Sequence, residues 1–92
     1  MPSTPVAELE VGERIVGTYA AQSKSLASFK SKPGQYLSLT LVDSTGQITA
    51  RMWDNAEEAA ALFSEGDAIT VRAVVEEYRG NKQLVIERLK LA

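Results

Sequence analysis

The stretch Gln35–Val42 (QYLSLTLV), the turn Asp43–Gly46 (DSTG) and the stretch Gln47–Trp53 (QITARMW) decide the fold. Apolar and polar side chains alternate in both longer stretches, which is the period-two pattern of strands with one buried face. The turn supplies the glycine that a tight hairpin needs. We therefore predict a hairpin with Leu37, Leu39, Leu41, Ile48, Ala50 and Met52 facing inward and Tyr36, Ser38, Thr40, Thr49, Arg51 and Trp53 facing outward.

Upstream of this hairpin, residues 15–25 have the character of a first strand. Gly17 inside this strand predicts a bulge or bend, because glycine weakens a strand interior and often marks such a site. Residues 26–34 are rich in lysine and serine and end in Pro33-Gly34, which indicates a loop. A strand and a polar loop therefore precede the hairpin.

Downstream, the pattern changes to that of a short helix and then back to strands. Asn55 is placed to cap a helix that runs through Phe63 and ends at Gly66. The segments 67–78 and 82–91 predict two strands joined by a two-residue turn at Gly80-Asn81. A register change is expected at Leu89 in the last strand.

The order of elements is thus three strands, one helix and two strands. It matches the OB-fold, a five-stranded, partly open Greek-key barrel, so we predict an all-β fold with one helix between strands three and four. We expect one domain, residues 9–92, after a short disordered lead-in at residues 1–8.

Composition excludes several kinds of chemistry in this chain. The 92 residues include neither cysteine nor histidine, so disulfides, Cys/His zinc sites, thiol nucleophiles and imidazole bases are absent. No apolar run approaches the roughly 20 residues that span a bilayer, and no signal-peptide pattern is present. We expect a soluble cytoplasmic protein with no cofactor, no metal and no catalytic residues.

The net charge of −2 conceals an uneven distribution. Residues 54–77 hold seven acids against one arginine, whereas residues 24–53 hold four cations against Asp43. OB-folds bind ligands across strands two and three, between the loop joining strands one and two and the loop joining strands four and five. This layout brings the basic segments together, and we expect the acids on the far side.

Single-stranded nucleic acid binds to OB-folds through a cationic groove and aromatic rings on which bases stack. The candidate binding residues are Lys24, Phe29, Lys30, Lys32, Tyr36, Ser38, Thr49, Arg51, Trp53, Tyr78, Arg79 and Lys82. Several of them have a structural alternative, and the lysines could simply be solvated loop residues. Trp53 could cover the helix, Phe29 could anchor its loop, and Tyr78 could serve packing alone. Arg51 could form a salt bridge with Asp43 or Asp54, and Ser38 leaves the centre of strand two without a ring.

The string Tyr36–Ile48 with Arg51–Asp54 and Glu65–Asp67 resembles OB domains of the anticodon-binding type. Gly17 upstream and the segment Val75–Leu84 downstream extend the match over about residues 9–92. Together they resemble the N-terminal OB domain of bacterial 3′–5′ exoribonucleases that carry an HD phosphohydrolase domain. The resemblance implies binding of single-stranded nucleic acid, RNA more than DNA, with low sequence specificity, and a linked HD hydrolase domain in the parent protein.

Two other functions fit the same pattern of residues. The chain could be a protein–protein adaptor that uses its acidic helix as the contact surface. It could also be a single-stranded-DNA-binding module of a replication or repair protein. Salt-dependent oligonucleotide binding distinguishes the first alternative from RNA binding, and RNA–DNA competition distinguishes the second.

Overall fold

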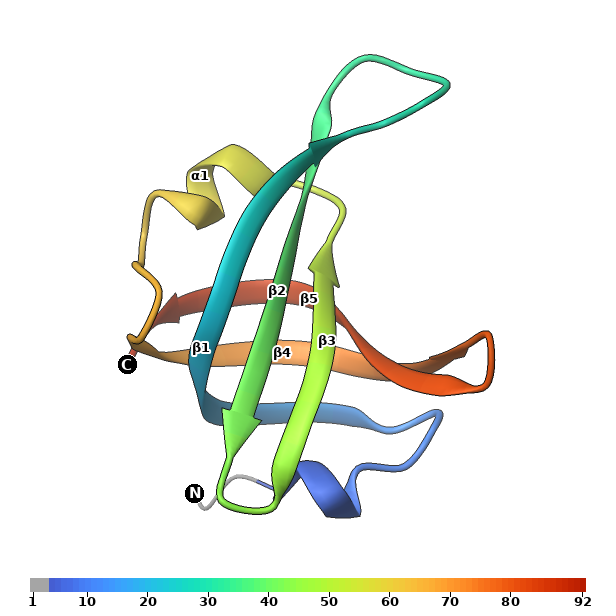
Figure 1. The fold of residues 1–92 in the computed structure, drawn as a ribbon, viewed down its shortest axis with the longest axis vertical. Helices are drawn as coiled ribbons and strands as arrows, with labels where there is room; N and C mark the ends of the chain where they lie inside the picture. The colour runs from blue at the N-terminus through green and yellow to red at the C-terminus, as the bar shows by residue number, and fades with distance from the viewer. Residues whose placement is uncertain (1–3) are drawn as a thin grey trace.

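The computed structural model describes residues 4–92, which form a closed five-stranded barrel with a short helix at one end (Figure 1). The elements are η1 (Val6–Glu8), β1 (Arg14–Ser28), β2 (Gln35–Asp43), β3 (Gly46–Met52), α1 (Ala56–Ala60), β4 (Ala68–Tyr78) and β5 (Asn81–Leu91). Within residues 4–92, no helix is long and apolar enough to cross a membrane.

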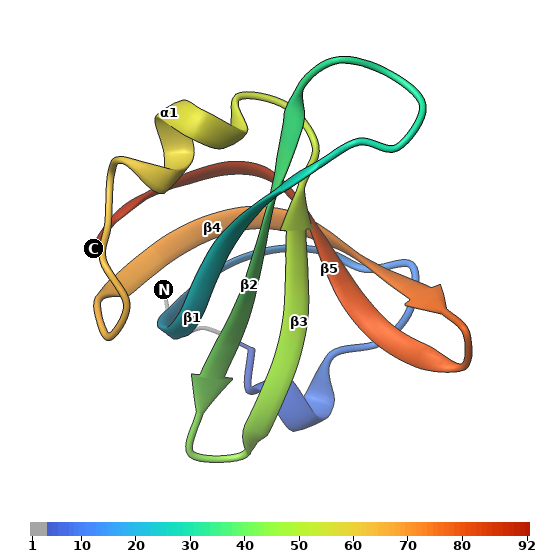
Figure 2. The same cartoon turned by 45° about the horizontal axis from the view of Figure 1, so that its top comes forward.

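The strand order around the barrel is β1-β2-β3-β5-β4, and β4 pairs with β1 to complete the ring. All neighbours are antiparallel except β3 and β5, which pair in parallel over Thr49–Arg51. This arrangement confirms the predicted all-β OB-fold, with its helix between β3 and β4. Figure 2 shows the 29–34 loop projecting beyond the upper end of β3 and the β4–β5 hairpin projecting to the right of β3.

The core consists of the inward residues of the two predicted hairpin strands together with those of β1, β4 and β5. The side chains of Leu37, Leu41 and Ala50 are fully buried, as the alternation predicts. On β4 the inward positions are Ile69, Val71, Ala73 and Val75, and β5 adds Leu84 and Ile86. The hairpin pattern therefore sets which side chains face solvent on β2 and β3.

Strand β1 differs from the prediction at Gly17. The bulge lies between Ala21 and Ser23, not at Gly17. Gly17 instead leaves room for the Tyr19 ring, because a Cβ there would lie 2.7 Å from the Tyr19 hydroxyl oxygen. The Tyr19 hydroxyl donates a hydrogen bond to the Thr4 carbonyl at 2.7 Å, and burial raises its pKa.

Several element boundaries also differ from the prediction. Strand β1 continues to Ser28 because residues 23–28 pair with β2, so the loop is shorter than expected. The helix ends at Ala60. Asn55 takes a left-handed conformation (φ 56°) and makes no side-chain capping bond. The two-residue turn consists of Arg79 and Gly80, both with positive φ, between the paired residues Tyr78 and Asn81.

Part of the expected disordered lead-in lies against the barrel, while residues 1–3 fall outside the described part. Val6 is buried, and its backbone N–H donates to the Asp43 carboxylate at 2.9 Å. That carboxylate also accepts from the Thr45 hydroxyl at 2.6 Å and from the Thr45 and Gly46 N–H groups. The Thr45 hydroxyl bond, followed by the backbone bonds, lowers the pKa of Asp43 despite an opposing contribution from desolvation.

Candidate nucleic-acid interface

Three aromatic rings gather where the 29–34 loop meets the ends of β2 and β3. The Tyr36 ring lies 4.9 Å from that of Trp53 and 5.4 Å from that of Phe29, measured between centroids. Phe29 and Trp53 are nearly parallel, with centroids 6.2 Å apart and an interplanar angle of 27°. Trp53 remains 40% exposed, so the ring cluster forms part of the surface.

Two cations lie against this cluster. The Lys32 ammonium is 4.5 Å from the Phe29 ring centroid, and the Arg51 guanidinium carbon is 5.6 Å from that of Tyr36. Cations at these distances are attracted by the negative face of an aromatic ring. The cluster thus combines an apolar surface, formed by the rings, with two positively charged groups at its edge.

The loop that carries Phe29 is closed on itself. The Phe29 N–H donates to the Gly34 carbonyl at 3.2 Å, and Gly34 has a φ of 109° that favours glycine. The Phe29 backbone therefore closes the loop, while its ring forms part of the aromatic cluster. Trp53 makes its ring contacts with Phe29 and Tyr36.

Arg51 does not form either of the salt bridges considered above. Within residues 4–92, no carboxylate lies in ion-pair distance of its guanidinium. The Asp43 carboxylate accepts a hydrogen bond from Thr45 at the opposite end of the β2–β3 hairpin from Arg51. The Arg51 Nε is buried with no hydrogen-bond partner among the described residues.

The β4–β5 hairpin supplies the other wall of the site. Tyr78 is 52% exposed, and the Arg79 guanidinium carbon lies 5.2 Å from its ring centroid. A hollow of about 140 Å³ is bounded by Arg51, Trp53, Tyr78 and Gln83. A second hollow, of about 220 Å³, adjoins it and is lined by Thr49, Arg51, Tyr78, Arg79, Asn81, Lys82 and Gln83.

Gln83 is a lining residue that the sequence analysis missed. It pairs with Thr49 across the parallel β3–β5 contact and stands on the outer face, since Leu84 and Ile86 point inward. The alternation of β5 predicts that Gln83 points outward. That it lies beside Thr49 follows only from the strand order, which the local sequence pattern does not reveal.

Two of the predicted lysines are engaged elsewhere. The Lys24 ammonium donates to the carbonyls of Ala60 and Phe63, at 2.8 and 2.6 Å, just after helix α1. The Lys82 ammonium donates to the Leu9 carbonyl. A cation near a helix C-terminus satisfies carbonyls that have no partner within the helix. Both lysines therefore serve the fold in this structure.

The remaining predicted residues lie near the aromatic cluster with side chains open to solvent. Lys30 is exposed in the same loop as Lys32. Ser38 pairs in register with Arg51 and is half-buried on the outer face. Apart from Lys24, the structure thus brings the predicted residues together around β3: Phe29, Lys30, Lys32, Tyr36, Ser38, Thr49, Arg51, Trp53, Tyr78, Arg79 and Lys82, which lines the 220 Å³ hollow although its ammonium is bound to the Leu9 carbonyl.

The expected separation of acids from this surface holds only in part. Helix α1 carries Glu57 and Glu58 and packs on β1 and β2 away from the β4–β5 hairpin (Figure 1). Glu76 and Glu77, however, lie on the β4–β5 hairpin, opposite Gln83 and Lys82 in register. They are next to Tyr78 because β4 extends to the hairpin tip. Part of the negative charge thus borders the site.

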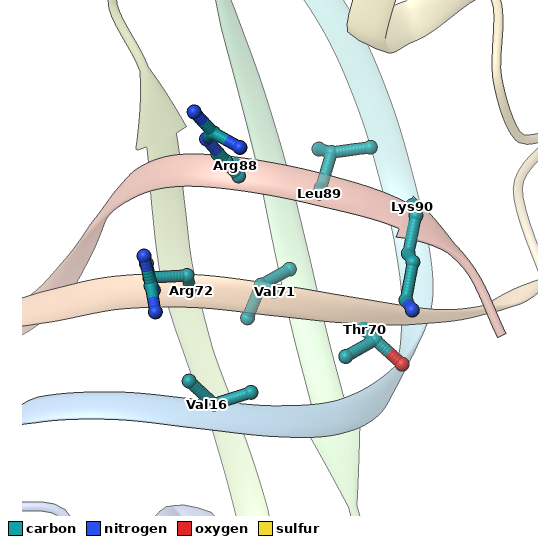
Figure 3. Close-up of a pocket in the computed structure, with 7 residues that line it drawn as sticks. All are labelled: Val16, Thr70, Val71, Arg72, Arg88, Leu89 and Lys90. Atoms are coloured by element: carbon teal, nitrogen blue, oxygen red, sulfur yellow. The ribbon is translucent and has the colours of Figure 1, made fainter.

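A second basic surface covers the outer face of β1, β4 and β5 (Figure 3). Arg72 stands opposite Arg88 in register, and their neighbour Val16 is 57% exposed. The hollow there measures about 280 Å³ and is lined by Val16, Thr70, Val71, Arg72, Arg88, Leu89 and Lys90. It offers positive charge but no ring for stacking, which distinguishes it from the face around Trp53.

The face around Trp53 carries groups that are suited to binding a nucleic acid. Its rings can stack on flat apolar groups, and its cations can attract phosphates. Among the described residues, no group of three or more acidic side chains could hold a metal ion.

Two curated relatives align with most of the chain. A 3′–5′ exoribonuclease YhaM from Halalkalibacterium halodurans is 35% identical over 83 residues, which cover 88% of this chain and 25% of the relative. Its counterpart from Listeria monocytogenes is 31% identical over 85 residues, covering 92% of this chain and 27% of the relative. The chain thus spans about a quarter of the length of these relatives.

Solved structures with the same fold include a replication factor A related protein from Methanobacterium thermoautotrophicum. It matches with a TM-score of 0.79 at 20% sequence identity, and the match covers 98% of this chain and 90% of the solved chain. The second OB-fold domain of replication protein A from Methanococcus maripaludis has a TM-score of 0.75 at 21% identity, covering 96% and 92%. A family model described as an OB-fold nucleic acid binding domain matches residues 21–92. On this evidence, the chain belongs to the OB-fold nucleic-acid-binding domain family of the anticodon-binding type.

Proposed function

We propose that the face around Trp53 binds single-stranded RNA with little overall sequence preference. The observation that carries the proposal is the contact of Phe29, Tyr36 and Trp53 with one another on the surface, with cations against two of the rings. Stacking on such rings tolerates any base, because every base has a π-face. Duplexes hide these faces, so the surface favours unpaired strands.

Phosphates are attracted by the cations at the borders of the ring cluster. Lys30 and Lys32 lie on the 29–34 loop, and Arg79 lies on the β4–β5 hairpin across β3. A strand that crosses β3 between these two projections places its backbone near both. The bases then reach the rings between them.

The relatives suggest a role for such binding in a longer protein. They are named 3′–5′ exoribonucleases, and this chain aligns with about a quarter of their length. In our proposal, this domain is non-catalytic and presents RNA to a linked hydrolase domain of a cytoplasmic protein. The names of the relatives support RNA over DNA as the ligand.

The direct test is the affinity for fluorescein-labelled oligouridine, measured by anisotropy. Charge reversal in the loop variant Lys30→Glu/Lys32→Glu is expected to abolish binding, because it replaces attraction to phosphates with repulsion. The matched control, Glu57→Gln/Glu58→Gln on helix α1, is expected to stay within a factor of a few of wild type. If the helix variant lost more affinity than the loop variant, the binding face would be misassigned.

Competition with oligodeoxyuridine addresses the choice between RNA and DNA. The proposal expects the RNA oligomer to displace the probe at a lower concentration, since the 2′-hydroxyl offers an additional hydrogen-bonding group. Preference for the DNA oligomer would support a module for single-stranded DNA. Absence of binding to both oligomers would favour the protein–protein adaptor.

A further inference from the structure

We propose that the hollow between Trp53 and Tyr78 accepts one guanine base, which is read by Arg51 and Gln83. The proposal rests on the binding of single-stranded RNA proposed above and adds one selective position to an otherwise tolerant surface. It starts from the lining of the hollow, which combines two aromatic residues, Trp53 and Tyr78, with two polar residues, Arg51 and Gln83.

The two aromatic residues of this hollow leave space between them. Trp53 packs against Tyr36 and Phe29, whereas Tyr78 contacts the Arg79 guanidinium. In the described part of the chain, no ring contact joins Trp53 to Tyr78. Both side chains are partly exposed, Trp53 to 40% and Tyr78 to 52%. A base that entered the hollow would cover apolar surface on both.

The polar residues of the hollow have unused hydrogen-bonding capacity. Across residues 4–92, neither the Arg51 guanidinium nor the Gln83 amide has a side-chain hydrogen bond or ion pair. Both residues lie on the outer face of the parallel β3–β5 pair, where Arg51 pairs with Val85 and Gln83 pairs with Thr49. They line the 140 Å³ hollow and the adjoining 220 Å³ hollow alike.

The Arg51 guanidinium is also held in place before any ligand arrives. Its central carbon lies 5.6 Å from the Tyr36 ring centroid, and its Nε is buried, so surrounding atoms restrict the movement of the group. The terminal nitrogens remain to contact a ligand. A planar donor group that is already oriented loses less freedom on binding than a mobile lysine would.

These groups select guanine by the pattern of donors and acceptors. Arginine only donates, and guanine presents two neighbouring acceptors, O6 and N7, which arginine contacts in a bidentate manner. Adenine places an amino donor where guanine has O6, and two donors cannot pair. The Gln83 amide carbonyl can accept from the N1–H or N2–H groups on the other edge of guanine.

The test uses short fluorescein-labelled oligouridines with one internal variable base: guanine, adenine, inosine or 7-deazaguanine. Wild-type protein is expected to bind the guanine probe about tenfold more tightly than the adenine probe. The 7-deazaguanine probe lacks the N7 acceptor, so its affinity should fall towards that of the adenine probe. Inosine retains O6 and N7 and should lose only the contact that the guanine amino group makes with Gln83.

Two variants distinguish recognition of the base from electrostatic attraction of the phosphates. Arg51→Lys keeps the positive charge but loses the planar, pre-oriented pair of donors, so the guanine-to-adenine ratio should fall clearly below the wild-type value while the salt dependence is retained. Arg72→Lys, on the face shown in Figure 3, is the matched control and should leave the ratio unchanged.

The outcomes distinguish this proposal from the one on which it rests. Equal affinity for the guanine and adenine probes, with binding intact, would overturn the guanine position and leave RNA binding standing. A guanine preference that is as strong in Arg51→Lys as in wild type would also overturn it. Loss of binding to every probe would instead contradict the proposed RNA-binding function.

Discussion

Trp53 is the residue on which the assignment of the binding face depends most. Its indole stacks beside Phe29 and remains 40% exposed, so little of the core depends on it. Trp53→Ala is expected to weaken oligouridine binding by about 1–3 kcal/mol, the usual contribution of a base–aromatic stack, with a small change in melting temperature. Anisotropy titration and thermal melting of this variant check both parts. A strongly destabilised variant with unchanged affinity would remove Trp53 from the site.

Lys24 shows why a residue type alone does not establish a binding role. Its ammonium donates to the carbonyls of Ala60 and Phe63 and lies 5.0 Å from the Phe63 ring centroid. Lys24→Ala should therefore lower the free energy of unfolding by about 1.5–3 kcal/mol, as expected for hydrogen bonds to a charged group. Urea unfolding measures this loss, and oligouridine affinity should stay near wild type. Wild-type stability combined with lost affinity would return Lys24 to the binding face.

At the scale of the elements, the alternating pattern predicted β2 and β3 well because each strand has one buried face. It could not place the ends of β1, since Leu26 and its neighbours pair with β2 although their own sequence is polar and loop-like. The β4–β5 turn was misplaced by one residue because Arg79, which is not glycine, takes a positive φ. Such features depend on partners distant in the sequence.

The same limit applies to the candidate site. The outward rings of Tyr36 and Trp53 follow from the alternation, and Phe29 follows from the position of its loop. The role of Lys82 could not be predicted, because its acceptor is the Leu9 carbonyl, 73 residues away in the chain. Gln83 likewise became a site residue only through the parallel pairing of β5 with β3.

Strand β1 offers a test of close packing around Gly17. A Cβ at this position would lie 2.7 Å from the Tyr19 hydroxyl oxygen and 2.9 Å from a ring carbon. Gly17→Ala must displace a buried ring, and we expect a loss of about 1–3 kcal/mol in the free energy of unfolding. The neighbouring control, Val16→Ala, changes an exposed side chain and should stay within about 0.5 kcal/mol of wild type. Equal stabilities for the two variants would contradict this packing.

The β2–β3 turn provides a pH-dependent contribution through Asp43. Its folded pKa is lowered below the usual 3.8, chiefly by the Thr45 hydroxyl bond, so the ionised form stabilises the fold. This contribution is present above about pH 4 and is lost as the pH falls through the lowered folded pKa. Asp43→Asn should therefore be less stable than wild type in urea at pH 7, and the difference should shrink at pH 2. A difference independent of pH would contradict the role of the charge.

At the scale of the whole molecule, the five strands close into a barrel in which every strand pairs with two neighbours. The side chains on the outer face therefore supply most of the surface for partners, and the rings and cations around β3 are the part of it suited to nucleic acid. The net charge of −2 does not prevent anion binding, because Lys30, Lys32, Arg51 and Arg79 border the rings. Local clustering of charge governs the attraction more than the total.

The fluorescence of Trp53, the single tryptophan of the chain, tests the central claim most directly. Oligouridine titrated at several salt concentrations should quench its emission in a saturable manner, because a base stacks on the indole. Contact with about three to five phosphates predicts a slope of about −2 to −3.5 for log affinity against log salt concentration. Unchanged emission at oligouridine concentrations that saturate the anisotropy signal, or an affinity independent of salt, would contradict the account.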